Sequence, residues 1–316
     1  MRKWALLLLL SAFAALPARA QWDAWFSRYD LAMGYYNPGY AGVNGDLEVT
    51  ALMKQQWIGI PRAGRPFLGQ ADLPLTLSNT KLGIGALLFT EPIGLFNNTL
   101  VALQLAYKHK LFGGMLSLGL QPGFASTSFD GTKVDLIGGK SPDHVAEDDA
   151  IPTTSVSGTT FDLSAGLYYT RKQFYFGLAS MHLMEPQMEL DENIYTYIPR
   201  SYNLTAGYNI QIKHTLFELR PSAFMMTDGQ SFLADITGRV AYNKLFNFGI
   251  SWRVNTSLVF LLGATIGNVE VGYAYDLPTS PLLRGSSGSH EVVLRYRINL
   301  DKGKNGNYKH KSVRIL

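Results

Sequence analysis

The 316-residue sequence predicts an all-β protein, a single transmembrane antiparallel β-barrel of about 14 strands, or at fewest about 12. Three observations point to this fold. Apolar and polar residues alternate with a period of two along almost the whole chain. After residue 20, no apolar run reaches the ~18 residues of a membrane-spanning helix. Short and long connections also alternate, as in outer-membrane barrels with short periplasmic turns and long extracellular loops.

Composition agrees with one large ordered domain. The chain is 47% hydrophobic and 16% charged, which is too apolar for a disordered protein. Cysteine is absent, so disulfides and thiolate catalysis are excluded. The formal charge of +4 arises from basic residues in the two terminal segments, and it therefore does not indicate a nucleic-acid surface.

The first segment, residues 1–20, has the pattern of a signal peptide. Arg2 and Lys3 precede an apolar run from Trp4 to Ala15, and Ala18-Arg19-Ala20 forms a small-residue cleavage site. A buried N-terminal helix is the alternative, and the charged start disfavours it. We expect cleavage near Ala20 and export from the cytoplasm.

The next segment, residues 21–45, shows no strand alternation and is rich in aromatic residues. Turn formers stand at Asn37-Pro38-Gly39. We expect a periplasmic or plug-like segment ahead of a barrel at 46–300. Its aromatic residues are Trp22, Trp25, Phe26, Tyr29, Tyr35, Tyr36 and Tyr40.

Strand-like alternation fills the range 46–300. Most of these strands are ~9–11 residues long, which is enough to cross the hydrocarbon layer at a tilt. Pro74 and Pro221 fit this pattern poorly, because proline cannot donate a ladder hydrogen bond. The expected strands are 47–56, 66–74, 81–90, 98–108, 115–123, 160–169, 174–181, 202–211, 216–226, 231–242, 246–253, 257–266, 269–276 and 290–300.

Every second connection is short, and this set includes 79–80, 109–114, 170–173, 212–215, 243–245 and 267–268. The other set includes 57–65, 91–97, 124–159, 182–201 and 277–289, with tight turns at 227–230 and 254–256. With an even number of strands, both chain ends lie on the periplasmic side. The acidic loop 124–159 is either a Ca²⁺-ordered loop or, as we favour, a solvated one.

The last hairpin shows the pattern most clearly. Apolar residues such as Tyr273 and Tyr275 alternate with polar ones, so one face suits lipid and the other suits the lumen. Glu291 shares the inner face with Arg295 and Arg297, and we expect it to form an ion pair within the barrel wall.

No catalytic or metal-binding pattern is found in the sequence. The six histidines are dispersed, and none forms a zinc or metalloprotease motif. Barrels with a Ser, His and acid site exist, but this sequence does not indicate such a set. We expect no enzymatic activity, no cofactor and no metal.

Short motifs recur in order through the mature chain. In sequence and separation they resemble N-P-A-Y-A-G, Q-W-x-G, I-G-x-x-N-N-T and G-Y-x-Y-D…G-S-H-E of the PorP/SprF family of type IX secretion outer-membrane proteins of Bacteroidota. Gly39 departs from the family's alanine. The matching stretches are Asn37-Pro38-Gly39-Tyr40-Ala41-Gly42, Gln56-Trp57-Ile58-Gly59, Ile93-Gly94 with Asn97-Asn98-Thr99, Gly272-Tyr273-Ala274-Tyr275-Asp276 and Gly288-Ser289-His290-Glu291.

The resemblance implies a non-enzymatic barrel in the cell outer membrane that works with the type IX machinery. Members of the PorP kind associate with the ring of PorK and PorN and, through PorE, with peptidoglycan. Members of the SprF kind help to export or anchor a surface adhesin or other cargo protein. Both roles stay open for this chain. The motif residues would serve the fold, with Asn37-Pro38 in a turn, Trp57 at the interface, and Asp276 and His290 flanking an extracellular loop.

Two questions stay open at this point. The tail 301–316 either docks an acidic periplasmic partner or stays solvated; its basic residues are Lys302, Lys304, Lys309, Lys311 and Arg314. The alternatives to a secretion role are a porin-like channel or hydrophobic-solute transporter, and a structural or adhesive barrel.

Overall fold

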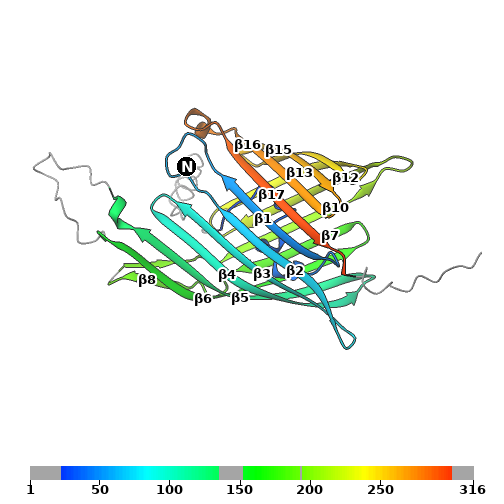
Figure 1. Ribbon diagram of the computed structural model, residues 1–316, viewed down its shortest axis with the longest axis horizontal. Helices are drawn as coiled ribbons and strands as arrows, with labels where there is room; N and C mark the ends of the chain where they lie inside the picture. The colour runs from blue at the N-terminus through cyan, green and yellow to red at the C-terminus, as the bar shows by residue number, and fades with distance from the viewer. Residues whose placement is uncertain (1–22, 135–151, 193, 301–316) are drawn as a thin grey trace, which may run out of the picture.

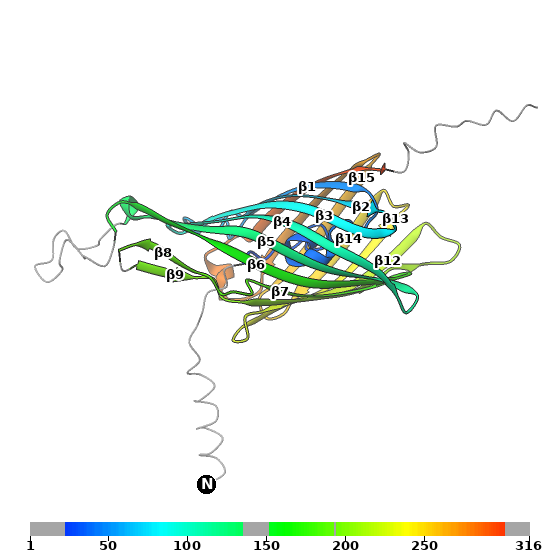
Figure 2. The ribbon, with the colours of Figure 1, turned by 90° about the horizontal axis from the view of Figure 1, so that it is seen from below.

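The computed structural model describes residues 23–134, 152–192 and 194–300. Antiparallel strands follow one another around a closed barrel (Figures 1 and 2). Strand β11 continues β10 beyond Asn209, so the 15-stranded sheet forms a wall of 14 strands. The wall strands are β1 (Leu47–Gln55), β2 (Phe67–Leu77), β3 (Thr80–Ile93), β4 (Phe96–Leu111), β5 (Gly114–Asp130), β6 (Ser155–Arg171), β7 (Phe174–Met181), β10 (Ser201–Tyr208) with β11 (Ile210–Gln211), β12 (Phe217–Thr227), β13 (Phe232–Tyr242), β14 (Phe246–Arg253), β15 (Ser257–Ile266), β16 (Val269–Pro278) and β17 (Ser289–Ile298).

Two pairings close the ring. β1 pairs with β17 along its whole length, from Leu47 opposite Ile298 to Gln55 opposite His290. On the far side β10 pairs with β12, from Tyr202 opposite Thr227 to Gly207 opposite Ser222. The closed ladder leaves the wall without the exposed strand edge that lipid could not satisfy.

The wall separates an apolar outer face from a polar inner face, as the alternation predicts. On β17, Val292 and Leu294 are 52% and 51% exposed, whereas Glu291 and Arg295, which flank this pair, are 1% and 2% exposed. An apolar belt that surrounds the barrel is stable in hydrocarbon and costly in water. The predicted membrane barrel is therefore confirmed.

Some strands are longer than expected. β5 and β6 have 17 residues each, more than the hydrocarbon layer requires, and they take up both ends of the expected 124–159 loop. The prediction of a loop at 91–97 is also wrong, because β3 and β4 continue to a tight turn in which Gly94 has φ +63°. Residues 135–151 of the acidic loop, where a Ca²⁺ site was one possibility, lie outside the described residues.

The two prolines lie within strands, contrary to the poor fit expected. Pro74 in β2 is opposite Gly83, and Pro221 in β12 is opposite Gly238. Each proline therefore lies opposite a glycine. The strand continues through the proline with one fewer ladder hydrogen bond, because proline has no N–H to donate.

A second, two-stranded sheet was not predicted. β8 (Gln187–Asp191) and β9 (Ile194–Tyr197) form a hairpin within the 182–201 connection, with an irregular register near its turn. Figure 2 places this hairpin beyond the barrel wall, beside the outer ends of β5 and β6. It contacts β6 but is not part of the wall.

Residues 23–46, here called the inner segment, lie inside the barrel (Figure 2). The segment contains α2 (Met33–Tyr36) and the 3₁₀ turn η1 (Pro38–Tyr40). From the sequence we expect a periplasmic or plug-like segment. In the structure it runs from Asp23, beside the outer ends of β7 and β10, to the periplasmic start of β1.

The apolar core of the molecule is built from this segment and the inner wall. Phe26 packs against Phe89 with ring centroids 6.4 Å apart, and Tyr36 packs against Phe224 at 4.6 Å. The aromatic residues absent from the strand pattern thus fill the lumen. No helix in the described part of the chain is long and apolar enough to cross a membrane.

Candidate functional site

The outer end of the inner segment is held by a buried charge cluster. Asp23 accepts a hydrogen bond from Ser201 Oγ at 2.6 Å and lies 3.2 Å from His182 Nε2. The other ring nitrogen, Nδ1, lies 2.8 Å from Asp162 Oδ2. Burial alone lowers the pKa of His182, but the charge of Asp23 and the hydrogen bonds that the ring donates to both carboxylates outweigh it and raise the pKa to about 10. His182 is therefore an imidazolium at neutral pH and ties the segment to β6 and β7.

A second cluster lies beside the first. Arg253 on β14 bonds Asp235 at 3.0 Å and Asp276, and its guanidinium lies 5.5 Å from the ring centroid of Trp25. The indole of Trp25 donates to Asp235 at 2.9 Å, and Lys54 Nζ donates to the Trp25 carbonyl at 2.6 Å. The family-motif residue Asp276 therefore points into the lumen and supports the arginine that holds the inner segment.

Glu291 also holds the inner segment. Its two carboxylate oxygens accept the backbone N–H groups of Ser27 and Arg28, both at 2.7 Å. The ion pair expected within the wall is not found among the described residues, because both carboxylate oxygens accept amides of the inner segment. Charge-assisted bonds to two amides satisfy donors that would otherwise be buried without partners.

The Asn37-Pro38 turn docks on glycines of the wall. Asn37 Oδ1 accepts from the Gly39 amide at 2.8 Å, and its Nδ2 donates to the Leu167 carbonyl at 3.0 Å. A side chain at Gly119 would place Cβ 2.3 Å from the Gly39 nitrogen, and one at Gly166 would place Cβ 2.2 Å from Asn37 Oδ1. Inward glycines on β5 and β6 thus make room for this turn.

The rest of this motif is held in the same way. The Gly42 amide donates to Asp72 at 2.7 Å, its carbonyl accepts from Lys108, and its φ of +64° favours glycine. Tyr40 packs edge-on against Tyr168 of β6 with centroids 5.3 Å apart. Both residues hold the segment as it leaves the lumen.

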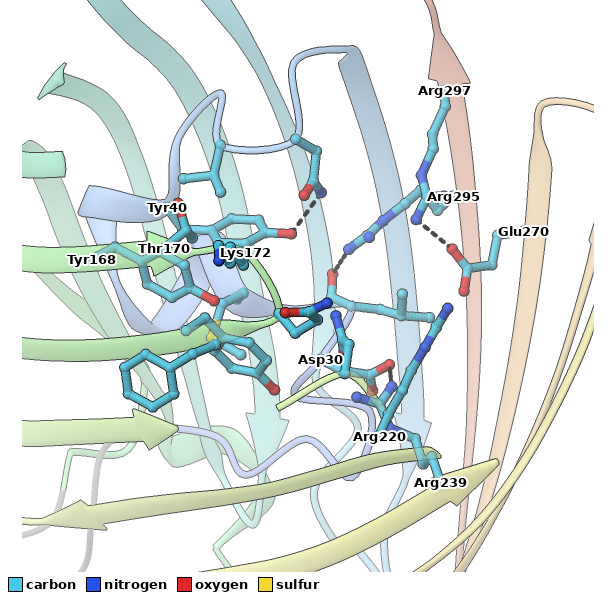
Figure 3. Close-up of a pocket in the computed structure, with 18 residues that line it drawn as sticks. Asp30, Tyr40, Tyr168, Thr170, Lys172, Arg220, Arg239, Glu270, Arg295 and Arg297 are labelled. Carbon is cyan, nitrogen blue, oxygen red and sulfur yellow. Dashed lines mark hydrogen bonds and ion pairs between the residues drawn. The ribbon is translucent and has the colours of Figure 1, made fainter. Parts of the chain in front are cut away.

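A polar pocket of about 420 Å³ opens beneath the inner segment at the periplasmic mouth (Figure 3). Arg297 on β17 bonds Glu270 at 2.7 Å and Glu48 at 2.8 Å. Arg239 pairs with Asp30 of the inner segment. Burial raises the pKa of Asp30, but Arg239 and Arg28 outweigh it, so the pKa lies below its ordinary value. The charged residues that line the pocket are Asp30, Lys172, Arg220, Arg239, Glu270, Arg295 and Arg297.

At the outer rim the structure brings separate motifs together. In the loop after β1, the Trp57 amide donates to Ser289 Oγ at 3.1 Å and the Ile58 amide to the Gly288 carbonyl at 2.8 Å. Further along that loop, the Arg62 carbonyl accepts from the Gly94 amide at 2.9 Å. The loop therefore bridges the β3–β4 turn and the β16–β17 connection.

The remaining motif residues lie beside this rim. Asn97 Oδ1 accepts from Thr90 Oγ1 at 3.1 Å across the β3–β4 hairpin. His290 Nδ1 lies 2.5 Å from the Tyr273 hydroxyl, and the Tyr275 hydroxyl donates to the Ser287 carbonyl at 2.6 Å. The contacts of His290 and Tyr275 join β16 to β17 and to the connection before it, on the outer face of the wall.

The signal peptide and the tail, with Lys302, Lys304, Lys309, Lys311 and Arg314, lie outside the described residues. The residues that sequence reasoning missed are Asp23, Asp162, His182, Arg253 and Arg28. A signal existed for two of them, because Asp162 and Arg253 occupy inward positions of predicted strands. Among the described residues, no group of three His, Cys, Asp or Glu side chains is placed to hold a metal.

The described geometry can be compared with known proteins. The family model for the type IX secretion system membrane protein PorP/SprF matches residues 18–296. No curated protein matches the chain. The toluene transporter TbuX of Ralstonia pickettii is 13% identical over 84% of this chain and 93% of that chain, with a TM-score of 0.49. The CymD monoaromatic hydrocarbon channel is 11% identical over 84% and 92%, with a TM-score of 0.44. Outer membrane phospholipase A from Escherichia coli is 13% identical over 83% and 98%, with a TM-score of 0.39.

At these identities and TM-scores, the solved structures carry no conclusion about function. The family match covers the inner segment, nearly the whole barrel wall and every motif that holds the two together. It places the barrel in the outer membrane. The chain belongs to the PorP/SprF family of type IX secretion system membrane proteins.

Proposed function

We propose that this protein serves type IX secretion by contact, as a barrel that joins other components on its two faces. Its partners would be the periplasmic ring of PorK and PorN with PorE, or a surface adhesin or cargo protein that it anchors or helps to export. The observation that carries this proposal is the occupied lumen. Residues 23–46 cross it from the outer ends of β7 and β10 to the start of β1.

The bonds that hold the inner segment in the lumen favour a contact role over the passage of solutes. Asp23, Trp25 and the amides of Ser27 and Arg28 are each bonded to charged or polar groups of the wall. Removing one partner of a buried charged pair costs about 3–5 kcal/mol. Opening the lumen would break several such contacts at once.

The proposal includes no catalysis. Among the histidines that the structure describes, His182 is the buried one, and each of its ring nitrogens faces a carboxylate. Neither nitrogen is therefore placed to take a proton from a serine, as a hydrolase of the Ser-His-acid type would require.

The parts of the chain would divide the work as follows. Residues 1–20 would direct export, the inner segment would occupy the lumen, residues 46–300 would form the wall, and the basic tail 301–316 would contact a periplasmic partner. The motif residues at the outer rim and on the inner segment would act as fold determinants that keep these parts in register.

Deletion of the gene tests the proposal. We expect type IX cargo to be lost from the medium or from the cell surface, and to return when the gene is supplied on a plasmid. The amount of cargo is measured by immunoblotting of the medium and by surface labelling of whole cells. Unchanged secretion and unchanged surface display in the deletion strain would contradict the proposal.

A further inference from the structure

We propose that the periplasmic mouth binds an acidic segment of a partner protein, whose carboxylates enter the pocket between Lys172, Arg220 and Arg297. This inference rests on the proposed function and deepens it, because it specifies the chemistry of one periplasmic contact. It follows from the charge at this end of the barrel, from the form of the pocket, and from the exclusion of two other ligands.

Basic side chains surround the periplasmic end. An exposed lysine or arginine lies in or beside five of the six short turns: Lys81, Lys110, Arg171, Lys172, Lys213 and Lys244. Within the described chain, none of these six has a carboxylate within 4.0 Å. Their charges are therefore not neutralised by this part of the protein.

Most acids at the same end are already engaged, and Asp46 before β1 is the exception among those the structure describes. Glu218 pairs with Arg220 at 3.1 Å, and Glu48 and Glu270 both pair with Arg297. The mouth therefore keeps an excess of positive charge. Such a surface attracts an acidic partner and raises its association rate.

The pocket also has the size and the exposed guanidinium groups that a carboxylate ligand requires. Its volume of about 420 Å³ is within the range of ligand pockets in proteins. The side chains of Arg220 and Arg297 are 30% and 38% exposed, so each guanidinium can donate to one more carboxylate, a second for Arg220 and a third for Arg297. Guanidinium groups bind carboxylates through two parallel N–H bonds, which gives direction as well as attraction.

Deeper in the pocket, Arg239 adds positive charge. Its side chain is 9% exposed, and among the described residues its Nε has no hydrogen-bond partner. A buried guanidinium N–H without an acceptor costs stability. That Nε is itself buried, so Arg239 contributes positive charge behind the pocket and no direct bond from this atom to a ligand.

Two other ligands fit less well. The chain's own tail, residues 301–316, has five basic residues and one acid, so it repels the mouth. Lipid phosphates lie around the outside of the wall, whereas Arg239 and Arg297 line the inside of the barrel. An acidic protein segment can enter from the periplasm and reach both.

The test uses purified full-length protein in a neutral detergent and a fluorescein-labelled octaglutamate peptide, followed by fluorescence anisotropy. The pocket variant is Lys172→Gln with Arg220→Gln. The matched control, Lys213→Gln with Lys244→Gln, removes the same charge from the same end outside the pocket. We expect the dissociation constant to rise about 10-fold in the pocket variant, as loss of two charged contacts implies, and less than about 3-fold in the control.

Each outcome decides the question. Equal weakening in both variants, no weakening in either, or no binding by the natural protein overturns the assignment, and so does displacement of the peptide by short-chain phosphatidylglycerol. Heat-modifiable migration on gels checks that both variants are folded barrels. Peptide binding is measured without secretion, so a failure here leaves the deletion test of the proposed function untouched.

Discussion

Single residues determine how the inner segment is seated. Gly119 and Gly166 are inward positions where any side chain would strike the Asn37-Pro38 turn, and Gly83 would place Cβ 1.9 Å from the Ala41 carbonyl oxygen. Small residues at these places look neutral in a strand pattern, since many inward glycines simply bend a strand. Their positions are explained only once the segment is inside the barrel.

His182 allows a prediction of pH dependence. Its pKa is raised from 6.5 to about 10, so its pairing with Asp23 and Asp162 stabilises the fold fully below about pH 6.5. That contribution falls as pH rises and is gone above about pH 10. Burial raises the pKa of Asp23, but His182 outweighs burial and the pKa lies below 3.8. The stabilisation from this pairing is therefore lost at the acid end only as the pH falls below about 3.8.

The measurement compares the natural protein with His182→Gln. We expect the variant to lose about 3 kcal/mol or more at pH 6, because two buried carboxylates are left without their cation. The temperature at which the folded gel band disappears should differ most at pH 6 and converge near pH 10.5. A difference that is constant across this range would contradict the charged pair.

At the scale of elements, local alternation was enough to find the wall. Each strand of the wall buries one face and exposes the other, so its pattern does not depend on distant contacts. The inner segment has no period, and its path depends on partners far away in sequence, such as Glu291 for the Ser27 amide. The prediction that Glu291 forms an ion pair within the wall failed for the same reason.

The β8–β9 hairpin was missed because its strands are short and lie within a long connection. It forms a separate sheet, so we expect the barrel to fold when residues 187–197 are replaced by a Gly-Ser linker, with some loss of stability because Met188 is buried in the core. Heat-modifiable migration and the unfolding midpoint measure this. A barrel that no longer folds, or a midpoint lowered as far as in His182→Gln, would show that the hairpin supports the wall.

At the scale of the whole molecule, the two ends of the barrel carry different chemistry. The outer rim joins three motif-bearing connections by backbone bonds, and the periplasmic mouth has an unneutralised basic ring around a cationic pocket. Between them the lumen is occupied along its length by the inner segment. This arrangement suits a protein that connects partners on two sides of the outer membrane.

Conductance across a planar lipid bilayer tests this account most directly. We expect the purified full-length protein to insert without steady current above the bare-bilayer baseline. A variant that lacks residues 24–44 but still shows heat-modifiable folding should conduct, because the wall then encloses an open path. Steady porin-like current through the natural protein would contradict the occupied lumen and the contact role built on it.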